Sequence, residues 1–246
     1  MLRRISAFLY GSLLLMLTVI VAYAFSDKAA IHLFLNGFHT PWQDDVMRCY
    51  TVVGEWIPYV VVVLLLFYKA GWGMFLLADV ALSGVLAQAA KYMADADRPY
   101  RWFANHYPDV QLPFVEGVRL SKFYSFPSGH TTTFFCLFMV LALVLTSYAA
   151  HQRVSRSPVF AYSCGRPHCL KRHLRYINAL IATLCFLLAA LGAYSRIYLS
   201  QHFLEDIFGG VFIGVFSTFI LLLFVPRLRH TRFWNWRPAR LRNSGL

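Results

Sequence analysis

Six long stretches of this 246-residue chain are almost free of charged side chains. A helix that crosses a bilayer needs about 20 predominantly apolar residues, because lipid cannot hydrogen-bond to the backbone. The stretches are 5–26, 56–68 (extended backwards past Glu55 towards Thr51), 70–90 (interrupted by Asp79), 131–150, 177–194 and 207–225. We therefore predict an all-α integral membrane protein with six transmembrane helices.

The first stretch has a second interpretation. Arg3 and Arg4 precede it, and the small residues Ala22 and Ala24 near its end resemble a signal-peptide cleavage site. The apolar part is longer than a usual signal-peptide core, so we predict a retained helix. In both interpretations residue 27 begins on the far side of the membrane.

The charge content agrees with a membrane protein. Charged residues make up 14% of the chain, against roughly a quarter in soluble domains. The net charge of +12 could indicate nucleic-acid binding, but the basic residues are divided among several segments between the predicted helices. We therefore expect the partner to be the lipid bilayer and not a nucleic acid.

The distribution of charge predicts an orientation. If the N-terminus is cytoplasmic, six helices place most Lys and Arg residues, and none of the 11 Asp and Glu residues, in cytoplasmic segments. The C-terminus is then also cytoplasmic, and the basic tail 226–246 would anchor to anionic lipid. Neither a repeat nor a linker divides the chain, so we expect a single domain, 1–246.

Three segments are predicted to lie on the outer side of the membrane: 27–55, 91–127 and the turn 195–202. In the first, apolar residues at helical spacing predict a helix that lies along the membrane surface; they are Ile31, Phe34, Leu35 and Phe38. The second segment is rich in aromatic residues. It either anchors the protein at the headgroups or forms a wall of a lipid-binding cleft.

Four residues of the predicted inner loop carry atoms that bind zinc. They are Cys164, His168, Cys169 and His173, but their spacing is not that of a common zinc site. In a reducing cytoplasm we expect free thiols in a basic loop, and no bound metal.

The predicted topology brings three polar clusters to the outer face. The third helix ends near Lys91 and Arg98, and Pro99 predicts a helix end just after Arg98. The fourth begins after Pro127-Ser128-Gly129-His130. The last two helices are joined by SRIYLSQHFLED, residues 195–206.

Each cluster alone allows an ordinary explanation. Lys91 and Arg98 could contact headgroups. Ser128 could cap a helix, although a helix start with free N–H groups also binds anions. His202 and Asp206 are four residues apart and are predicted to share a helix face, as a hydrogen-bonded pair or as a nucleophile with an orienting carboxylate.

Together the clusters favour phosphoryl chemistry. Three cations (Lys91, Arg98 and Arg196) would stabilise the negative charge of a phosphoryl group in the transition state. One histidine can attack while the other protonates the leaving oxygen. A metal at His202 and Asp206 is disfavoured, because the cations would repel a divalent ion.

At these residues the sequence resembles the type 2 phosphatidic acid phosphatase superfamily, the membrane lipid phosphate phosphatases. The family pattern is K-x6-R-P, P-S-G-H and S-R-x5-H-x3-D. Here it stands as KYMADADRP (91–99), PSGH (127–130) and SRIYLSQHFLED (195–206), a motif core of 91–206 in which every specified position matches.

The resemblance implies a role for each residue. His202 would be the nucleophile that forms a phosphohistidine, Asp206 would orient it, and His130 would be the general acid and then the base for water. The phosphate-binding residues would be Lys91, Arg98, Ser128, Gly129 and Arg196, with Ser195 and Pro127 in support. The family uses neither a metal nor a cofactor.

The resemblance therefore implies a metal-independent lipid phosphatase in the bacterial inner membrane, with its site facing the periplasm or exterior. Candidate substrates are undecaprenyl diphosphate, phosphatidylglycerophosphate, phosphatidic acid and lipid A. Two alternatives remain open. The same site could transfer phosphate between lipids, or the chain could be a non-enzymatic transporter, although no inverted repeat supports the latter.

Overall fold

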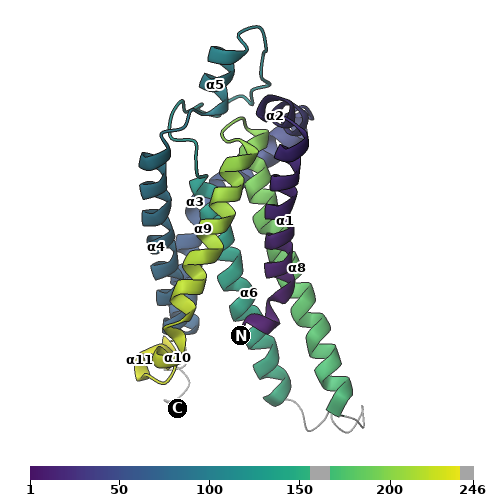
Figure 1. Cartoon of the computed structure of the whole chain (residues 1–246). Coiled ribbons are helices and arrows are strands. Elements are labelled where there is room, and N and C mark those ends of the chain that lie inside the picture. The colour runs from purple at the N-terminus through teal and green to yellow at the C-terminus, as the bar shows by residue number, and fades with distance from the viewer. Residues whose placement is uncertain (156–166, 239–246) are drawn as a thin grey trace.

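The structure is a computed structural model that describes residues 1–155 and 167–238, with side chains described for 1–150 and 172–238. All of its regular elements in these ranges are helices (Figure 1). A short 3-10 helix, Leu2–Arg4, precedes α1 (Ser6–Phe25), α2 (Lys28–Asn36), α3 (Pro41–Tyr68), α4 (Ala70–Ala94), α5 (Pro99–His106), α6 (Gly129–Ser155), α8 (Pro167–Tyr198), α9 (Leu204–Leu222), α10 (Val225–Leu228) and α11 (Arg232–Asn235).

Six segments are long and apolar enough to cross a membrane, which confirms the predicted number. They are Ser6–Phe25, Pro41–Tyr68, Ala70–His106, Gly129–Ala150, Arg172–Tyr198 and Leu204–Leu228. Most of the helices extend beyond the uncharged stretches, because charged side chains are tolerated in helical turns outside the hydrocarbon region.

The second helix departs most from the prediction. The predicted extension of this helix past Glu55 towards Thr51 is confirmed, but residues 41–50, expected in an outer segment, also belong to α3. Pro41 stands in the first turn, where its missing N–H costs nothing, and Asp44 lies in the same turn. The charges of Asp44, Asp45 and Arg48 interrupt the apolar stretch without interrupting the helix.

The outer surface helix predicted around Ile31 is present as α2, which starts at Lys28 with the Asp27 carboxylate accepting a hydrogen bond from the Ala30 N–H. The prediction that it lies along the membrane surface stays a prediction. The short helix α5 was not predicted, although its buried residues Pro99 and Phe103 are four positions apart, as on one face of a helix.

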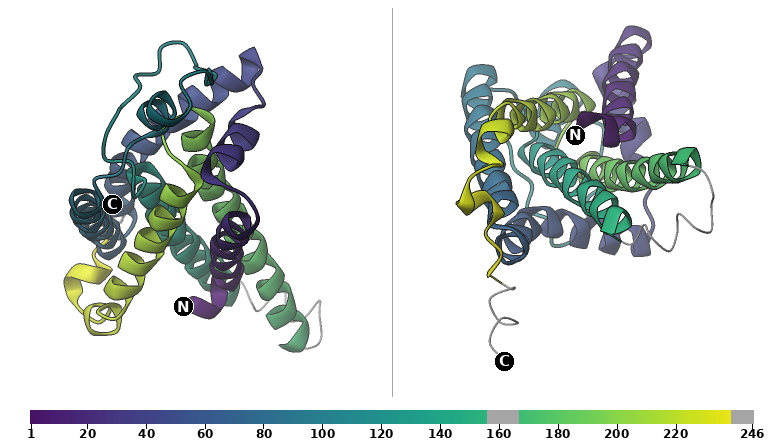
Figure 2. Two further views of the ribbon diagram at one scale, coloured as in Figure 1. Left: turned by 45° about the horizontal axis from the view of Figure 1, so that its top comes forward. Right: turned by 90° about the horizontal axis from the view of Figure 1, so that it is seen from below.

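The long helix α6 is the centre of the bundle. It packs against α8, α9 and α4, and the view from below shows it surrounded by them (Figure 2). Phe135, Met139 and Leu143 are buried on it. A Cβ atom at Gly214 of α9 would lie 2.7 Å from the Thr132 carbonyl oxygen of α6, so the glycine permits the close approach of these helices.

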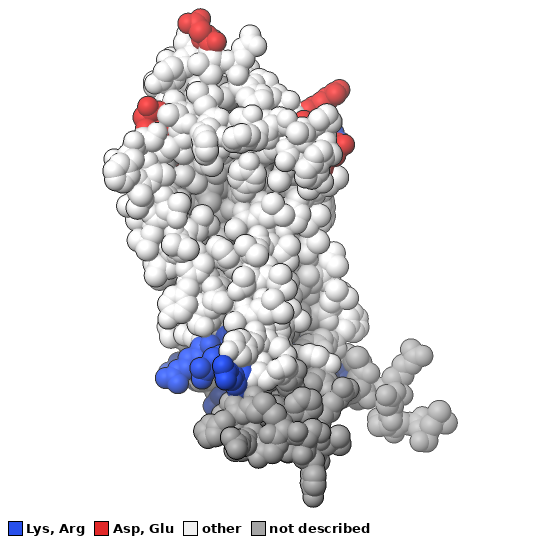
Figure 3. All heavy atoms as spheres, turned by 90° about the vertical axis from the view of Figure 1, so that its right-hand side faces the viewer, with Lys and Arg blue, Asp and Glu red and all other residues white. Residues whose placement is uncertain are grey.

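The two ends of the bundle differ in charge. Helices α2 and α5 lie at one end, and Leu2–Arg4, α10 and α11 lie at the other (Figure 1). On the face in Figure 3, Asp and Glu gather at the α2–α5 end, a larger patch of Lys and Arg lies at the opposite end, and an uncharged band separates them. Residues 239–246 of the basic tail lie outside the described residues.

Candidate active site

The first cluster lies where α4 gives way to α5. Lys91 is in the last turn of α4, which closes at Asp95 with a positive φ of 40°. The expectation that Pro99 ends this helix was wrong. The helix has already ended at Ala94, and Pro99 instead stands in the first turn of α5, the helical position that best accepts proline.

Arg98 is half-buried and fixed by neighbouring loops. Its Nε donates to the Phe123 carbonyl at 2.9 Å, and its Nη1 donates to Gln201 Oε1 at 3.1 Å. Its backbone N–H donates to the Lys122 carbonyl at 3.0 Å. These contacts preorganise the guanidinium beside the turn that carries His202.

The second cluster forms the start of α6, as predicted. Ser128 is buried, and its Oγ accepts hydrogen bonds from the Thr131 N–H at 3.4 Å and from the Thr131 hydroxyl at 3.0 Å. Its capping role is therefore confirmed. A Cβ atom at Gly129 would meet no atom within 4 Å, so the helix start is open to an approaching group, as anion binding there requires.

Pro127 is also buried and packs close to α9, where a Cβ at Gly209 would lie 2.9 Å from the Pro127 Cβ. The Ser128 N–H donates to the Asp206 carbonyl at 3.0 Å. The second and third clusters are thus joined through the backbone.

His130 has a partner that the sequence did not suggest. Its Nε2 lies 2.9 Å from Oε1 of Glu55 on α3. His130 also interacts electrostatically with Arg196 and His202. The imidazole therefore stands between a carboxylate and the residues of the third cluster.

The third cluster starts inside α8, not in a turn as expected. Ser195 and Arg196 lie in its last turn, and both are buried. The Ser195 hydroxyl donates to the Gly192 carbonyl at 2.7 Å, and Arg196 Nη1 donates to the Thr51 hydroxyl on α3. Arg196 Nε has no hydrogen-bond partner among the described residues. A buried guanidinium with a spare donor is suited to an anion.

The backbone then folds back sharply. The Arg196 carbonyl accepts from the N–H groups of Gln201 at 2.9 Å and His202 at 3.1 Å. Helix α9 begins only at Leu204, so the expectation that His202 and Asp206 share a helix face was wrong. Phe203 is extended and caps the helix, so His202 lies outside α9. The Asp206 side chain, in the first turn of α9, points back and contacts the His202 ring.

The His202–Asp206 pair is fully buried. His202 Nδ1 lies 3.3 Å from Asp206 Oδ2. The same oxygen accepts hydrogen bonds from the Ser125 hydroxyl at 2.5 Å and the Phe203 N–H at 2.8 Å. The carboxylate is thereby held in place, and its contact with Nδ1 fixes how the imidazole is turned.

The electrostatics keep the His202 imidazole neutral. Burial, followed by the positive charges of Arg98, Arg196 and Lys91, holds the pKa of His202 well below its ordinary value of 6.5. A neutral imidazole has the free lone pair that a nucleophile needs. All three predicted cations thus contribute to lowering the pKa of His202.

A cluster of aromatic residues adjoins the His202–Asp206 pair through Phe203. The ring of His32 on α2 is buried, with centroids 5.1 Å from Phe203 and 5.6 Å from Phe103. Glu205 in the first turn of α9 forms an ion pair with Lys28 of α2. These contacts fasten α2 against the start of α9.

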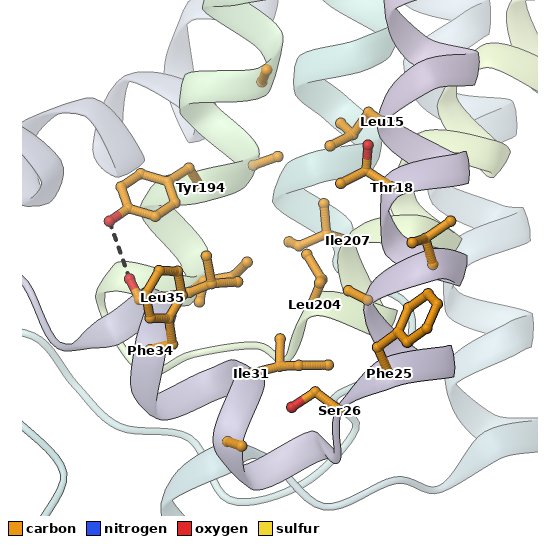
Figure 4. Close-up of a pocket in the computed structure, with 16 residues that line it drawn as sticks. Leu15, Thr18, Phe25, Ser26, Ile31, Phe34, Leu35, Tyr194, Leu204 and Ile207 are labelled. Carbon is orange, nitrogen blue, oxygen red and sulfur yellow. Dashed lines mark hydrogen bonds between the residues drawn. The ribbon is translucent and has the colours of Figure 1, made fainter.

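An apolar cavity of about 600 Å³ opens beside the turn (Figure 4). It lies between α1, α2, α8 and α9, and residues from all four elements line it, among them Leu15, Ile31, Tyr194 and Leu204. Leu204 follows His202 by two residues, so the cavity and the histidine pair are neighbours along the chain.

The chain matches the PAP2 superfamily over residues 72–230. This chain belongs to the PAP2 superfamily. PAP2 proteins of this kind are membrane lipid phosphate phosphatases, which are hydrolases, and this member is a multi-pass membrane protein.

Two curated proteins are similar to this PAP2 chain. A phosphatidylglycerophosphatase B of Bacillus subtilis is 25% identical over 198 residues, covering 78% of this chain and 80% of the relative. A lipid A 4'-phosphatase of Bacteroides thetaiotaomicron is 24% identical over 219 residues, covering 87% and 83%. A crystal structure of a PAP2-type phosphatidylglycerolphosphate phosphatase from Bacillus subtilis has the same fold, with a TM-score of 0.57, 24% identity, and 95% and 100% of the two chains covered.

The structure thus gathers the predicted residues of this PAP2 protein at one end of the bundle, and it adds Glu55, Ser125 and Gln201. Glu55 could have been noticed as a carboxylate at the end of an apolar stretch. Ser125 and Gln201 gave no signal, because common polar residues in loops have no characteristic spacing. The side chains of Cys164, His168 and Cys169 lie outside the described residues.

Proposed function

We propose that this protein hydrolyses a lipid phosphate or diphosphate through a phosphohistidine at His202. The observation that carries the proposal is the buried His202–Asp206 pair with three cations acting on it. Among the described residues, Lys91, Arg98 and Arg196 have no ion-pair partner. An unpaired cation cluster around a neutral nucleophile is suited to a phosphoryl group.

In the first step, His202 Nε2 attacks phosphorus while the bond to the leaving oxygen breaks. His130, in its protonated form, donates a proton to that oxygen. Lys91, Arg98 and Arg196, with the Ser128 hydroxyl and the Gly129 N–H, bind the phosphoryl oxygens, whose charge is spread in the transition state. Asp206 stabilises the positive charge that the attacking imidazole acquires.

In the second step, water attacks the phosphohistidine and His130 removes its proton. The P–N bond breaks, inorganic phosphate leaves, and both histidines return to their starting states. Ser195 and Pro127 support the arrangement through the hydrogen bond to Gly192 and the packing on α9. The fixed cations supply the charge that a metal would otherwise supply, so we expect no metal requirement.

The substrate class follows from the surroundings of the site. The named relatives act on phosphatidylglycerophosphate and on lipid A. The apolar cavity beside Leu204 offers room for a hydrocarbon chain next to the site. We infer a lipid with a terminal phosphate, bound with its headgroup at the three clusters.

The test is phosphate release from a panel of lipid phosphates by the purified protein in detergent. We expect His202→Ala to abolish turnover and His130→Ala to reduce kcat by about 10²–10⁴-fold. EDTA should leave the activity unchanged. A His202→Ala protein that still hydrolyses lipid phosphate would refute the mechanism, and phosphate release that required an acceptor lipid would identify a phosphotransferase.

We also propose that the site faces the exterior or periplasm of a bacterial inner membrane, with the N-terminus and the basic tail in the cytoplasm. Cys49 is free and exposed on α3, in the half that carries Glu55. In intact cells, an impermeant maleimide should label a variant that retains only Cys49. A variant that retains only Cys164 should be labelled only after permeabilisation, and the reverse result would invert the topology.

A further inference from the structure

A polar hollow of about 540 Å³ lies between the end of α4 and the loop that follows α5. Its lining residues include four cations, Lys91, Arg98, Arg119 and Lys122, and no Asp or Glu among the residues that the structure describes. Two of the cations are family motif residues at the phosphate site. Arg119 and Lys122 belong to none of the three motifs.

Some basic residues at this end of the protein are neutralised by a carboxylate, and Arg119 and Lys122 are not. Lys28, Arg48 and Arg101 each form an ion pair, with Glu205, Asp45 and Asp97. Arg119 and Lys122 form no ion pair with any described residue. Their charge is therefore available to a bound anion.

The loop that carries these two cations is tied to the catalytic residues. Gln201 Nε2 donates to the Arg119 carbonyl at 3.2 Å, while Gln201 Oε1 accepts from Arg98. The backbone N–H and Nε of Arg98 donate to the carbonyls of Lys122 and Phe123. The Cα positions of both cations are thus fixed relative to Arg98 and to the turn before His202.

We infer that this hollow binds a second phosphate of the lipid headgroup, next to the phosphate that is cleaved. The inference rests on the proposed function, since Lys91 and Arg98 are taken to hold the scissile phosphate. The second phosphate is linked to the first either directly, as in a diphosphate, or through a short bridge, as in a phosphodiester headgroup that ends in a phosphate. A lipid with one phosphate leaves Arg119 and Lys122 without a ligand.

The test compares three detergent-solubilised substrates: phosphatidic acid, a prenyl diphosphate and phosphatidylglycerophosphate. For the double variant Arg119→Gln/Lys122→Gln, we expect kcat/KM for at least one two-phosphate lipid, relative to that for phosphatidic acid, to fall about 10-fold or more. This is the scale of a lost charge-assisted hydrogen bond. The substrate with the larger loss identifies the linkage between the phosphates.

Two control variants make the comparison specific. Arg119→Lys/Lys122→Arg keeps the charge and should retain most of the preference. Arg48→Gln removes one charge at the same end, outside the hollow, and should leave the preference unchanged. An equal loss on all three substrates would overturn the inference in favour of a general attraction to anionic surfaces, and so would no loss at all.

The failure of this inference is distinguishable from failure of the proposed function. If the parent protein hydrolyses these lipids in a His202-dependent way but the double variant keeps its preference, only the second phosphate site is refuted. If the parent protein releases no phosphate from any of the three, the inference falls together with the proposed function.

Discussion

Oε1 of Glu55 lies 2.9 Å from Nε2 of His130, which joins α3 to the first turn of α6. Glu55 belongs to none of the three motifs, yet it contacts the histidine proposed as the general acid. A carboxylate in this position orients the ring and stabilises its protonated form during proton transfer.

We therefore expect Glu55→Gln to lower kcat about 10-fold with little change in KM, since substrate binding does not depend on the carboxylate. The decisive measurement is a double-mutant cycle with His130→Ala. If Glu55 acts through His130, Glu55→Gln should have almost no further effect once His130 is alanine. Additive losses would show that Glu55 acts elsewhere.

Gly210 is predicted to be needed for activity as well as for packing. A Cβ at this position of α9 would lie 2.7 Å from both the Ser128 carbonyl oxygen and the Thr131 Cβ. Gly210→Ala should push α9 away from the start of α6, at a cost of about 1–3 kcal/mol in the free energy of unfolding, and lower kcat. Gly84→Ala is the matched control, because a Cβ there meets nothing within 4 Å; equal behaviour of the two variants would contradict the prediction.

Asp79 is a buried carboxylate within the bundle whose role we predict to be structural. It accepts hydrogen bonds from the hydroxyls of Ser217 and Thr218 on α9, both at 2.6 Å. Asp79→Ala should lower stability by about 1–3 kcal/mol, measured as the melting temperature in detergent. Asp79 lies three helical turns from Lys91, roughly 18 Å along α4, so kcat at a permissive temperature should change little. A large loss of kcat in a stably folded variant would point to a part in the chemistry.

The burial of His32 predicts that the folded protein becomes less stable in acid. Its buried imidazole has a pKa lowered to about 4 from 6.5, chiefly by burial, with the nearby Lys28 adding to the effect and Asp206 opposing it. Between these values the unfolded chain binds a proton that the folded protein does not, so stability falls as pH falls from about 6.5 to about 4, by up to about 3 kcal/mol.

His32→Phe should reduce the loss of melting temperature between pH 7 and pH 5. His106→Gln is the control, because His106 is exposed on α5 and should leave that loss unchanged. A pH dependence in His32→Phe identical to that of the parent would assign the acid sensitivity to other groups.

The sequence predicted which polar clusters come together better than it predicted the ends of the helices that carry them. Apolar stretches and loop charge were enough to bring Lys91, His130 and His202 to one end, because six crossings leave few alternatives. Helix ends were less accurate, since Pro41 starts a helix whose first turns are charged, and α5 is a helix of only eight residues within a segment expected as a loop. The Phe203 N–H donates to Asp206 three residues later, a local contact at the start of α9, but the Ser125 hydroxyl that holds the same carboxylate comes from a distant loop, which no local pattern encodes.

Contacts between distant segments were the least predictable part. Glu55 and His130, or Gln201 and Arg119, are far apart in the chain, and each pair is set by how whole helices pack. Such polar contacts involve residue types that are common in loops and at helix ends. These contacts are therefore determined by the packing of the bundle and not by the local sequence.

The junction between α3 and α4 is covered by Trp234, which belongs to a segment that is synthesised much later. Its ring lies against Gly71 and Trp72 at the α3–α4 junction, where a Cβ on Gly71 would come within 2.4 Å of the indole, and the Trp236 carbonyl accepts from the Ala70 N–H. During synthesis the chain emerges N-terminus first, so the early hairpin must wait for this late segment before its junction is covered. Until α11 has been translated, Gly71 and Trp72 lack this contact, and the α3–α4 hairpin is stabilised only by its other contacts.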